Sequence, residues 1–330
     1  RPCQGRGREF ESRFPLQIQK ADFKSAFFMP QALYNLKIIS LLVFKESRMS
    51  QKPSSPIGVF DSGYGGLTIL KELVKTLPEY DYLYLGDNAR APYGTRSYDT
   101  VYKFTLECVR YLFDAGCQLV ILACNTASAK ALRTIQQHDL ALIDPNRRVL
   151  GVIRPSAEAV GALTHTQSVG VLGTTGTVKS ESYVIEIQKL FPHIHVLQQD
   201  CPMWVPLVEN GEYDSLGADY FIQESLAKLF VQDAAIDTVI LGCTHYPLLI
   251  NKIRQFLPTG TCLVSQGEIV AHSLVDYLRR HPEIDEKCSK SSTRSFLTTD
   301  NADIFDQRAA VFFGERVSST HVSIMPHIVG

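Results

Sequence analysis

The sequence predicts an α/β fold with two pseudo-symmetric domains, each a mostly parallel sheet flanked by helices, and an active site in the cleft between them. Apolar runs typical of buried strands alternate with segments whose apolar residues have helical spacing, as in parallel sheets covered on both faces. Two motifs also occur twice, in the same order, a little over a hundred residues apart. That separation is the length of a domain, so it indicates duplication rather than a short repeat.

The two repeated motifs are strand ends. An apolar strand with Gly in its second place runs into a Ser/Thr and Gly turn at IGVFDSGYGG, from Ile57, and at VGVLGTTGTV, from Val169. An apolar run that ends at a cysteine occurs as LVILACNTASA, with Cys124, and as TVILGCTHYPLL, with Cys243. Because ligands bind at the carboxyl ends of parallel strands, we expect each thiol at the rim of its own sheet, with one site between the two rims.

The remaining elements of the first half follow from apolar spacing and turn residues. Residues 67–77 have helical spacing and end before Pro78, and residues 80–87 form the next strand. Pro92 and Gly94 predict a loop over residues 88–97. A long helix that ends at Gly116 comes next, followed by the strand before Cys124 and a short strand over residues 149–152.

The second half repeats this order, and a tail remains after it. The expected elements are strands over 169–174, 193–200 and 239–241, helices over 179–190 and through Leu226 and Phe230, and a loop over 201–213. In the tail we expect a strand at 262–265, a helix at 269–280, an exposed loop at 282–294 and a final segment at 296–314. This tail returns to complete the first domain.

These elements predict the domain boundaries. Residues 56–150 and 264–330 form the first α/β domain, residues 151–263 form the second, and residues 1–55 are an extension and linker that is not part of the fold. Residues 1–48 open on Arg1 and precede Met49 and a polar linker, so we interpret them as an added leader before a start at Met49. A regulatory or partner-binding extension is the alternative. Its apolar part is about half the roughly 20 residues that span a bilayer.

Composition and charge exclude several classes of protein. The formal net charge is -1, which disfavours binding to nucleic acid or to an anionic membrane surface. Eight cysteines without a CxxC pair indicate neither a disulfide framework nor a zinc site. We therefore expect reduced thiols in a cytoplasmic protein, with no metal.

Cys124 and Cys243 are the candidate reactive residues. A cysteine on an apolar strand is most often a buried structural thiol. These two, however, lie at strand ends, where a helix amino terminus lowers a thiol's pKa from about 8.5. Polar residues follow each of them, namely Asn125 and Thr126 in the first half and Thr244 and His245 in the second.

Other polar residues surround the same strand ends. Asp61 and Ser62 precede a Gly-rich turn, where Asp61 either caps the helix or acts on a proton or ammonium. His245 is either a core histidine or a partner for the thiol two residues before it. Thr174 and Thr177 take the corresponding place in the second half, where we expect them to hold a substrate carboxylate. Glu209 is a candidate whose default interpretation is a surface carboxylate.

A thiol on each side of a site suits proton exchange at a stereocentre. One thiolate removes the α-proton of an amino acid from one face, and the opposing thiol delivers a proton to the other. Configuration then inverts without a cofactor. Hydrogen bonds to the substrate carboxylate in a dry cleft stabilise the carbanion-like state.

FDSGYGG, LGDNARAPYG, ACNTASA, LGTTGTVKS and GCTHYPLL together resemble the glutamate racemase family, from about Pro56 to the end of the chain. The resemblance implies a cofactor-independent, two-domain isomerase, usually a homodimer, that makes D-glutamate for peptidoglycan. It implies that Cys124 takes the proton of the D-enantiomer and Cys243 that of the L-enantiomer. Asp61 and His245 would assist the thiols, with Glu209 behind them. The implied substrate-binding positions are Asp61, Ser62, Pro92, Tyr93, Gly94, Asn125, Thr126, Thr174, Thr177, Thr244 and His245.

Two departures and two alternatives accompany this resemblance. Ser265 and Gln266 stand where the family often has an Asp-Ser segment, and we expect a local structural effect without loss of activity. The 48-residue extension has no general counterpart in the family, although some members carry shorter leaders that bind a peptidoglycan precursor as an activator. An aspartate racemase resembles this layout but typically has Glu-Ile in place of His245 and Tyr246. A protein that only binds an amino acid is the alternative from another class.

Overall fold

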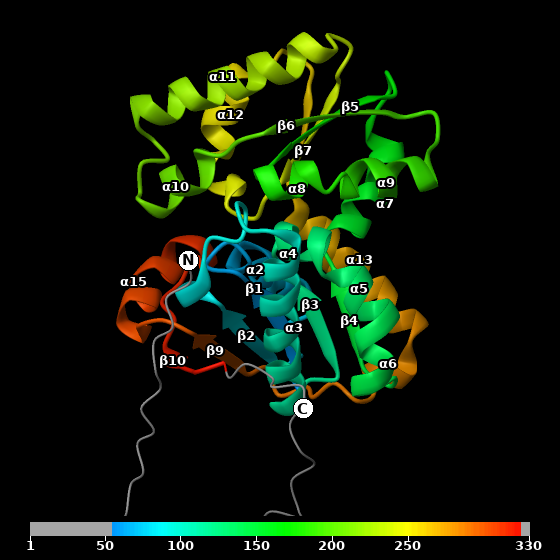
Figure 1. The fold of residues 1–330 in the computed structure, drawn as a ribbon, viewed down its shortest axis with the longest axis vertical. Coiled ribbons are helices and arrows are strands. Elements are labelled where there is room, and N and C mark those ends of the chain that lie inside the picture. The colour runs from blue at the N-terminus through cyan, green and yellow to red at the C-terminus, as the bar shows by residue number, and fades with distance from the viewer. Residues whose placement is uncertain (1–54, 325–330) are drawn as a thin grey trace, which may run out of the picture. The chain divides into compact units, whose positions relative to one another are not determined.

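The computed structural model describes residues 55–324 and contains the two parallel sheets that the sequence predicts (Figure 1). The predicted extension, residues 1–55, lies outside this range except for its last residue. The first sheet has the order β10-β9-β2-β1-β3-β4 and the second the order β6-β5-β7-β8. The strands are β1 (Ile57–Asp61), β2 (Tyr82–Gly86), β3 (Leu119–Leu122), β4 (Arg148–Gly151), β5 (Ser168–Gly173), β6 (His195–Asp200), β7 (Thr238–Gly242), β8 (Cys262–Val264), β9 (Arg294–Thr298) and β10 (Ser319–His321).

The strand order confirms that the two halves share one plan. The run β2-β1-β3-β4 in the first sheet corresponds, strand for strand in chain order, to β6-β5-β7-β8 in the second. The strand before Cys124 is therefore the counterpart of the strand before Cys243. β9 and β10 extend the first sheet beyond β2, as we expected of the tail. The exact domain boundaries stay a prediction.

Helices cover both sheets (Figure 1). They are α2 (Leu67–Thr76), α3 (Tyr98–Asp114), α4 (Asn125–Lys130), α5 (Leu132–Thr134), α6 (Leu140–Ile143), α7 (Ile153–Leu163), α8 (Thr175–Lys179), α9 (Ser182–Leu190), α10 (Trp204–Glu209), α11 (Leu216–Gln232), α12 (Ile250–Phe256), α13 (Gln266–Arg280), α14 (Pro282–Asp285) and α15 (Ala302–Phe313). Short helical turns of other types lie at Asn88–Arg90, Ile135–Asp139 and Tyr246–Leu249. None of the helices within residues 55–324 is both long enough and apolar enough to cross a membrane.

The first sheet is buried on both faces because successive strand residues point to opposite sides. Ile57 and Val59 of β1 belong to one core with α2, α13 and α15. Phe60, the residue after Val59, points to the opposite face and belongs to a second core with α3 and α4. Ser97 starts α3 by accepting a hydrogen bond from the Thr100 backbone N–H at 3.2 Å.

The second sheet is sandwiched in the same way. Val171 and Ile240 pack with α7 and α9 on one face. Leu172 and Leu241, the next residue in each strand, pack with α11 and α12 on the other. These continuous apolar strands are what a parallel sheet between two helical layers requires.

Four expected elements differ from the structure. The loop expected over 201–213 contains the helix α10. The helix expected over 179–190 begins only at Ser182, as α9, because Glu181 adopts a left-handed conformation with φ +54° and separates it from α8. α13 begins at Gln266, three residues before the predicted start. The expected exposed loop at 282–294 contains α14, and its Ile284 and Cys288 side chains are buried.

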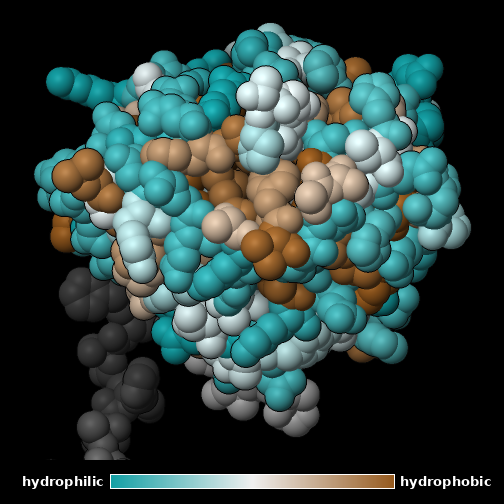
Figure 2. Space-filling model, turned by 90° about the horizontal axis from the view of Figure 1, so that it is seen from above, coloured by the Kyte–Doolittle hydropathy of each residue, from teal (hydrophilic) through white to brown (hydrophobic). Residues whose placement is uncertain are grey.

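Figure 2 looks from above onto the second-sheet end of the view in Figure 1. Apolar side chains gather in the middle of this face and hydrophilic ones surround them. The large apolar side chains of α11 that are exposed are Leu216, Tyr220 and Val231. Single exposed apolar residues are common on protein surfaces.

Candidate active site

A cavity of about 140 Å³ lies where strand ends from both sheets meet. Residues that follow β1, β3, β5, β6 and β7 line it, as expected of parallel sheets. The volume is close to that of a cavity of about 150 Å³ that accommodates benzene, so the site suits a small molecule. Its lining comprises Asp61, Ser62, Gly63, Ala91, Pro92, Tyr93, Gly94, Thr95, Cys124, Asn125, Thr126, Thr174, Thr175, Cys201, Pro202, Val205, Pro206, Glu209, Cys243 and Thr244.

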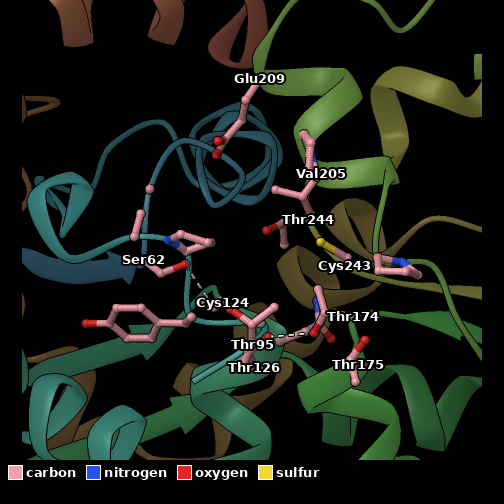
Figure 3. Close-up of a pocket in the computed structure, with 18 of the residues that line it drawn as sticks. Ser62, Thr95, Cys124, Thr126, Thr174, Thr175, Val205, Glu209, Cys243 and Thr244 are labelled. Atoms are coloured by element: carbon pink, nitrogen blue, oxygen red, sulfur yellow. Dashed lines mark hydrogen bonds between the residues drawn. The ribbon is translucent and has the colours of Figure 1, made fainter. Parts of the chain in front are cut away.

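Both predicted cysteines reach this cavity, and they come from different sheets. Cys124 follows β3 and Cys243 follows β7, the corresponding strand of the other half. Each is buried, with 7% and 6% of its surface exposed. In Figure 3, Cys124 lies beside Ser62 and Cys243 beside Thr244. The cavity therefore has a thiol contributed by each half.

Cys124 has an acidic and a hydroxyl neighbour. The Ser62 hydroxyl lies 3.4 Å from its sulfur, a contact drawn in Figure 3. Burial, together with the nearby Asp61 carboxylate, raises the pKa of the Cys124 thiol to about 12, in spite of the lowering effect of Ser62. The lowered pKa that we expected from a helix amino terminus is not found, because burial outweighs the lowering effect of the Ala127 backbone N–H in the first turn of α4. The thiol is protonated at neutral pH.

Cys243 has a cationic neighbour instead. Its sulfur lies 3.9 Å from Nδ1 of His245, and Nε2 of His245 lies 3.0 Å from Oε1 of Glu209. Burial alone lowers the pKa of His245, but its hydrogen bonds with Cys243 and Glu209 outweigh burial and raise this pKa to about 10. His245 is thus an imidazolium at neutral pH, and a cation beside the sulfur stabilises a thiolate.

The imidazole is held from the first half as well. The Phe312 ring of α15 packs edge-on against His245, with ring centroids 5.3 Å apart. His245 does not line the cavity. It stands behind Cys243 and joins that thiol to Glu209, which does line it.

Asp61 is the last residue of β1 and is only 1% exposed. Its Oδ2 accepts a hydrogen bond from the Gly63 backbone N–H at 2.8 Å. Its Oδ1 has no hydrogen-bond partner among residues 55–324. Burial raises the carboxyl pKa, against the lowering influence of His245. A buried carboxylate oxygen left without a donor at a cavity wall is suited to accept a hydrogen bond from a ligand.

The threonines join the two halves across the cavity. The Thr126 hydroxyl lies 2.9 Å from that of Thr174, as Figure 3 shows, and 3.4 Å from that of Thr177. Thr174 caps α8 by accepting a hydrogen bond from the Thr177 backbone N–H. Thr177 is fully buried behind the cavity and does not line it. Of the predicted binding residues, then, Thr177 and His245 do not line the cavity but lie behind residues that do.

A loop of the first half closes another side. Pro92, Tyr93 and Gly94 line the cavity, and the Gly94 carbonyl accepts a hydrogen bond from the Gly176 backbone N–H of the second half at 2.8 Å. The Tyr93 hydroxyl points away and donates to Asp87. An ideal Cβ on Gly94 would lie 3.0 Å from the Thr174 Cβ, so the loop approaches the second half closely.

Several lining residues were not predicted from the sequence. Thr95 and Thr175 each follow a predicted residue, and Cys201, Val205 and Pro206 belong to the segment after β6. The position of that segment at a strand end was a usable signal. It was overlooked because Val205 and Pro206 carry no reactive group, and because Cys201, like the other cysteines apart from Cys124 and Cys243, was interpreted as a structural thiol.

Comparison with known proteins decides the family. The model of the Asp/Glu/Hydantoin racemase family matches residues 57–272. The chain belongs to this family. The match confirms the resemblance stated from the sequence, and it covers most of both sheets.

The similar proteins are glutamate racemases. That of Geobacter metallireducens is 43% identical over 227 residues, which is 69% of this chain and 81% of that protein. That of Bacillus cereus is 38% identical over 81% of this chain and 96% of its own length. A crystal structure of glutamate racemase isoform RacE1 from Bacillus anthracis matches with a TM-score of 0.75 and 33% identity, over 83% of this chain and 99% of that one. A complex of the Francisella tularensis enzyme with D-glutamate matches with a TM-score of 0.73, 33% identity and the same coverage.

Proposed function

We propose that this chain is a glutamate racemase that interconverts L- and D-glutamate by proton transfer between Cα and two thiols. The observation that carries the proposal is that Cys124 and Cys243 reach one small cavity from corresponding strands of different sheets. A thiol on each side is what inversion at a carbon requires. The identity to glutamate racemases and the D-glutamate complex of a structural relative support glutamate as the substrate.

The proposed reaction is balanced within the enzyme. One thiolate takes the Cα proton, and the electron pair of the broken C–H bond stays on the substrate, delocalised toward its carboxylate. The opposite thiol then gives its proton to the other face of Cα. Each turnover leaves the two sulfur atoms with exchanged protonation states, so the product state of one direction is the starting state of the reverse direction.

The surroundings of the two sulfur atoms differ. Cys124 is protonated at neutral pH because burial and Asp61 disfavour its thiolate. Cys243 stands beside His245, whose raised pKa keeps a cation near this sulfur. In this proposal L-glutamate gives its proton to Cys243 while Cys124 donates. For D-glutamate, Cys124 must first lose its proton, and the substrate ammonium near Asp61 would offset the charge that makes this loss unfavourable.

The polar lining would bind the substrate. We assign the unpartnered Asp61 Oδ1 to the ammonium group, and the hydroxyls of Ser62, Thr126, Thr174 and Thr244, with backbone N–H groups, to the carboxylates. Such donors also stabilise the carbanion-like state, where charge spreads onto the α-carboxylate. Tyr93 would contribute through its backbone and ring, since its hydroxyl is bonded to Asp87.

The finer roles implied by the resemblance are part of the same proposal. They are a place in the cytoplasm, assembly as a homodimer, and supply of D-glutamate for peptidoglycan. A peptidoglycan-precursor activator stays a prediction.

The direct test is an assay of the purified protein with each enantiomer of glutamate and of aspartate, in deuterated water, with no pyridoxal phosphate added. We expect the optical rotation of either glutamate enantiomer to decay to zero while deuterium enters Cα. Turnover of aspartate alone would favour the aspartate racemase alternative. Binding without exchange or loss of rotation would contradict the proposal and favour the amino-acid-binding protein.

Gly65→Ala should damage the Cys243 side of the site. An ideal Cβ at Gly65 would lie 2.5 Å from both His245 Nδ1 and Thr244 Oγ1, so the turn after β1 must move away from these residues. We expect kcat to fall about tenfold or more, because small misplacements of reacting groups are costly. Racemisation kinetics measure this effect.

Gly217→Ala is the matched control, because its Cβ would meet only the Ser215 hydroxyl, at 3.4 Å, within α11. It should keep the kcat of the unmodified protein. The same kcat in Gly65→Ala would show that close packing at this turn is unimportant for the reaction.

A further inference from the structure

A buried polar ring lies directly behind Cys124. Asn125, the residue after Cys124, donates from Nδ2 to Oε1 of Gln266 at 2.6 Å. Gln266 donates from Nε2 to the Tyr183 hydroxyl at 2.8 Å, and that hydroxyl donates to Oδ1 of Asn125 at 2.7 Å. Each member of the ring thus gives one hydrogen bond and accepts one. The three residues are at most 2% exposed.

Gln266 has one donor left, and this donor extends the ring to α7. Its Nε2 lies 2.8 Å from the Ser156 hydroxyl, which in turn donates to the Val152 carbonyl at 3.0 Å. The Gln266 amide therefore has partners for both hydrogens and for its oxygen. A buried network in which every member is satisfied is rigid, whereas the loss of one member leaves the others unpaired at a cost.

The ring joins the places where the chain passes between the sheets. Gln266 begins α13, directly after β8, and Val152 precedes α7, directly after β4. Asn125 begins α4 on the first-sheet side, and Tyr183 belongs to α9 on the second. The Gln266 side chain thus lies at both segments where the chain passes between the sheets, and it contacts α4 of the first half and α9 of the second.

The ring uses most of the Asn125 side chain. Its amide donates one hydrogen to Gln266 and its oxygen accepts from Tyr183, so the second Nδ2 hydrogen and the backbone N–H are left to face a ligand. The side chain consequently anchors the turn that carries Cys124. The corresponding turn at Cys243 is anchored differently, by His245 and Glu209.

We propose that Gln266 is a positioning residue for Cys124: its amide, through Asn125 and Tyr183, fixes the Cys124 sulfur at the distance from Cα that proton transfer requires. The proposal deepens and rests on the proposed function, since it assigns the ring to one of the two proton transfers. Its consequence is one-sided. Loss of the ring should impair proton transfer at Cys124 and leave transfer at Cys243 largely intact.

The test separates the two transfers with a 3-chloro analogue of glutamate. A base takes the Cα proton, the electron pair forms a C=C bond, and chloride leaves from Cβ; the enamine product then hydrolyses to a keto acid and ammonia. Only one base is needed. Cys243→Ser protein should therefore eliminate chloride from the D-configured analogue through Cys124, and Cys124→Ser protein from the L-configured analogue through Cys243.

Gln266→Met, which keeps the length of the side chain and removes its hydrogen bonds, is then added to each background. We expect elimination in the Cys243→Ser background to fall about tenfold or more, as for a displaced catalytic group. Elimination in the Cys124→Ser background should stay within about twofold. Tyr183→Phe, which removes one hydroxyl, should act on the same side. The double variant should be little worse than either single variant, because the ring acts as a unit.

Tyr82→Phe is the matched control. Its hydroxyl is also buried and donates to the Leu73 and Leu77 carbonyls, away from the cavity. It should leave both eliminations unchanged. Equal losses on both sides, or no loss for either ring variant, would overturn the proposal while leaving the proposed function intact. Failure of the unmodified protein to racemise glutamate would overturn both.

Discussion

Cys124→Ser and Cys243→Ser will each lose at least about a hundredfold in kcat for glutamate racemisation, the usual contribution of a general acid or base. A serine hydroxyl is a far weaker acid than a thiol, so the substituted side neither accepts nor delivers the Cα proton. The remaining cysteine still faces the substrate from its own sheet. Each variant should therefore keep proton abstraction from one enantiomer, D for Cys243→Ser and L for Cys124→Ser.

Polarimetry measures the loss of racemisation, and chloride release from the 3-chloro analogues measures the surviving half-reaction. Cys117→Ser is the control, because Cys117 is fully buried in the core beneath α3 and does not line the cavity. It should racemise at the rate of the unmodified protein. Two cysteine variants that both retain full racemisation would refute the assignment of two thiol bases.

The parts of the fold that the sequence predicted are those encoded locally. The strands that lead to the site, β1, β3 and β7, are mostly apolar runs followed by polar residues, so the strand ends at Asp61, Cys124 and Cys243 were recognisable. In a parallel sheet the strand ends share one edge, so these residues were also expected to meet. Their arrival at one cavity follows from that rule and from the duplication.

The parts that the sequence did not predict depend on distant partners. The role of Gln266 is set by Asn125, Tyr183 and Ser156, which come from three other helices. We expected only a local effect at this position. Phe312 likewise packs against an imidazole of the other half, and nothing in its own segment indicates that contact.

The prediction that the pKa of the Cys124 thiol is lowered was wrong for a related reason. A strand end before a helix suggested a lowered pKa, which is a local argument. The structure buries the sulfur and sets Asp61 beside it, and these long-range effects raise the pKa instead. Burial is a property of the assembled fold. A sequence pattern therefore predicts where a cysteine lies in the fold more readily than it predicts the pKa of that cysteine.

Glu209→Gln should shift the alkaline limb of the activity profile to lower pH. In the unmodified protein the pKa of His245 is raised from 6.5 to about 10 by Cys243 and Glu209, against burial. The imidazolium beside Cys243 therefore persists until the pH approaches 10. The glutamine keeps a hydrogen-bonding oxygen without the charge, so the pKa of His245 falls and the cation is lost earlier. We expect kcat at pH 8 to fall roughly tenfold.

The same shift makes a separate prediction for stability. A histidine whose folded pKa exceeds its unfolded value contributes stability that is complete below the unfolded pKa and disappears as pH rises through the folded one. The His245 contribution to the free energy of unfolding should thus decline between pH 6.5 and about 10. Denaturant unfolding across this range should show a decline that is smaller in Glu209→Gln. NMR titration of the His245 ring would report its pKa directly, and a value near 6.5 in the unmodified protein would contradict the ion pair on which the Cys243 side depends.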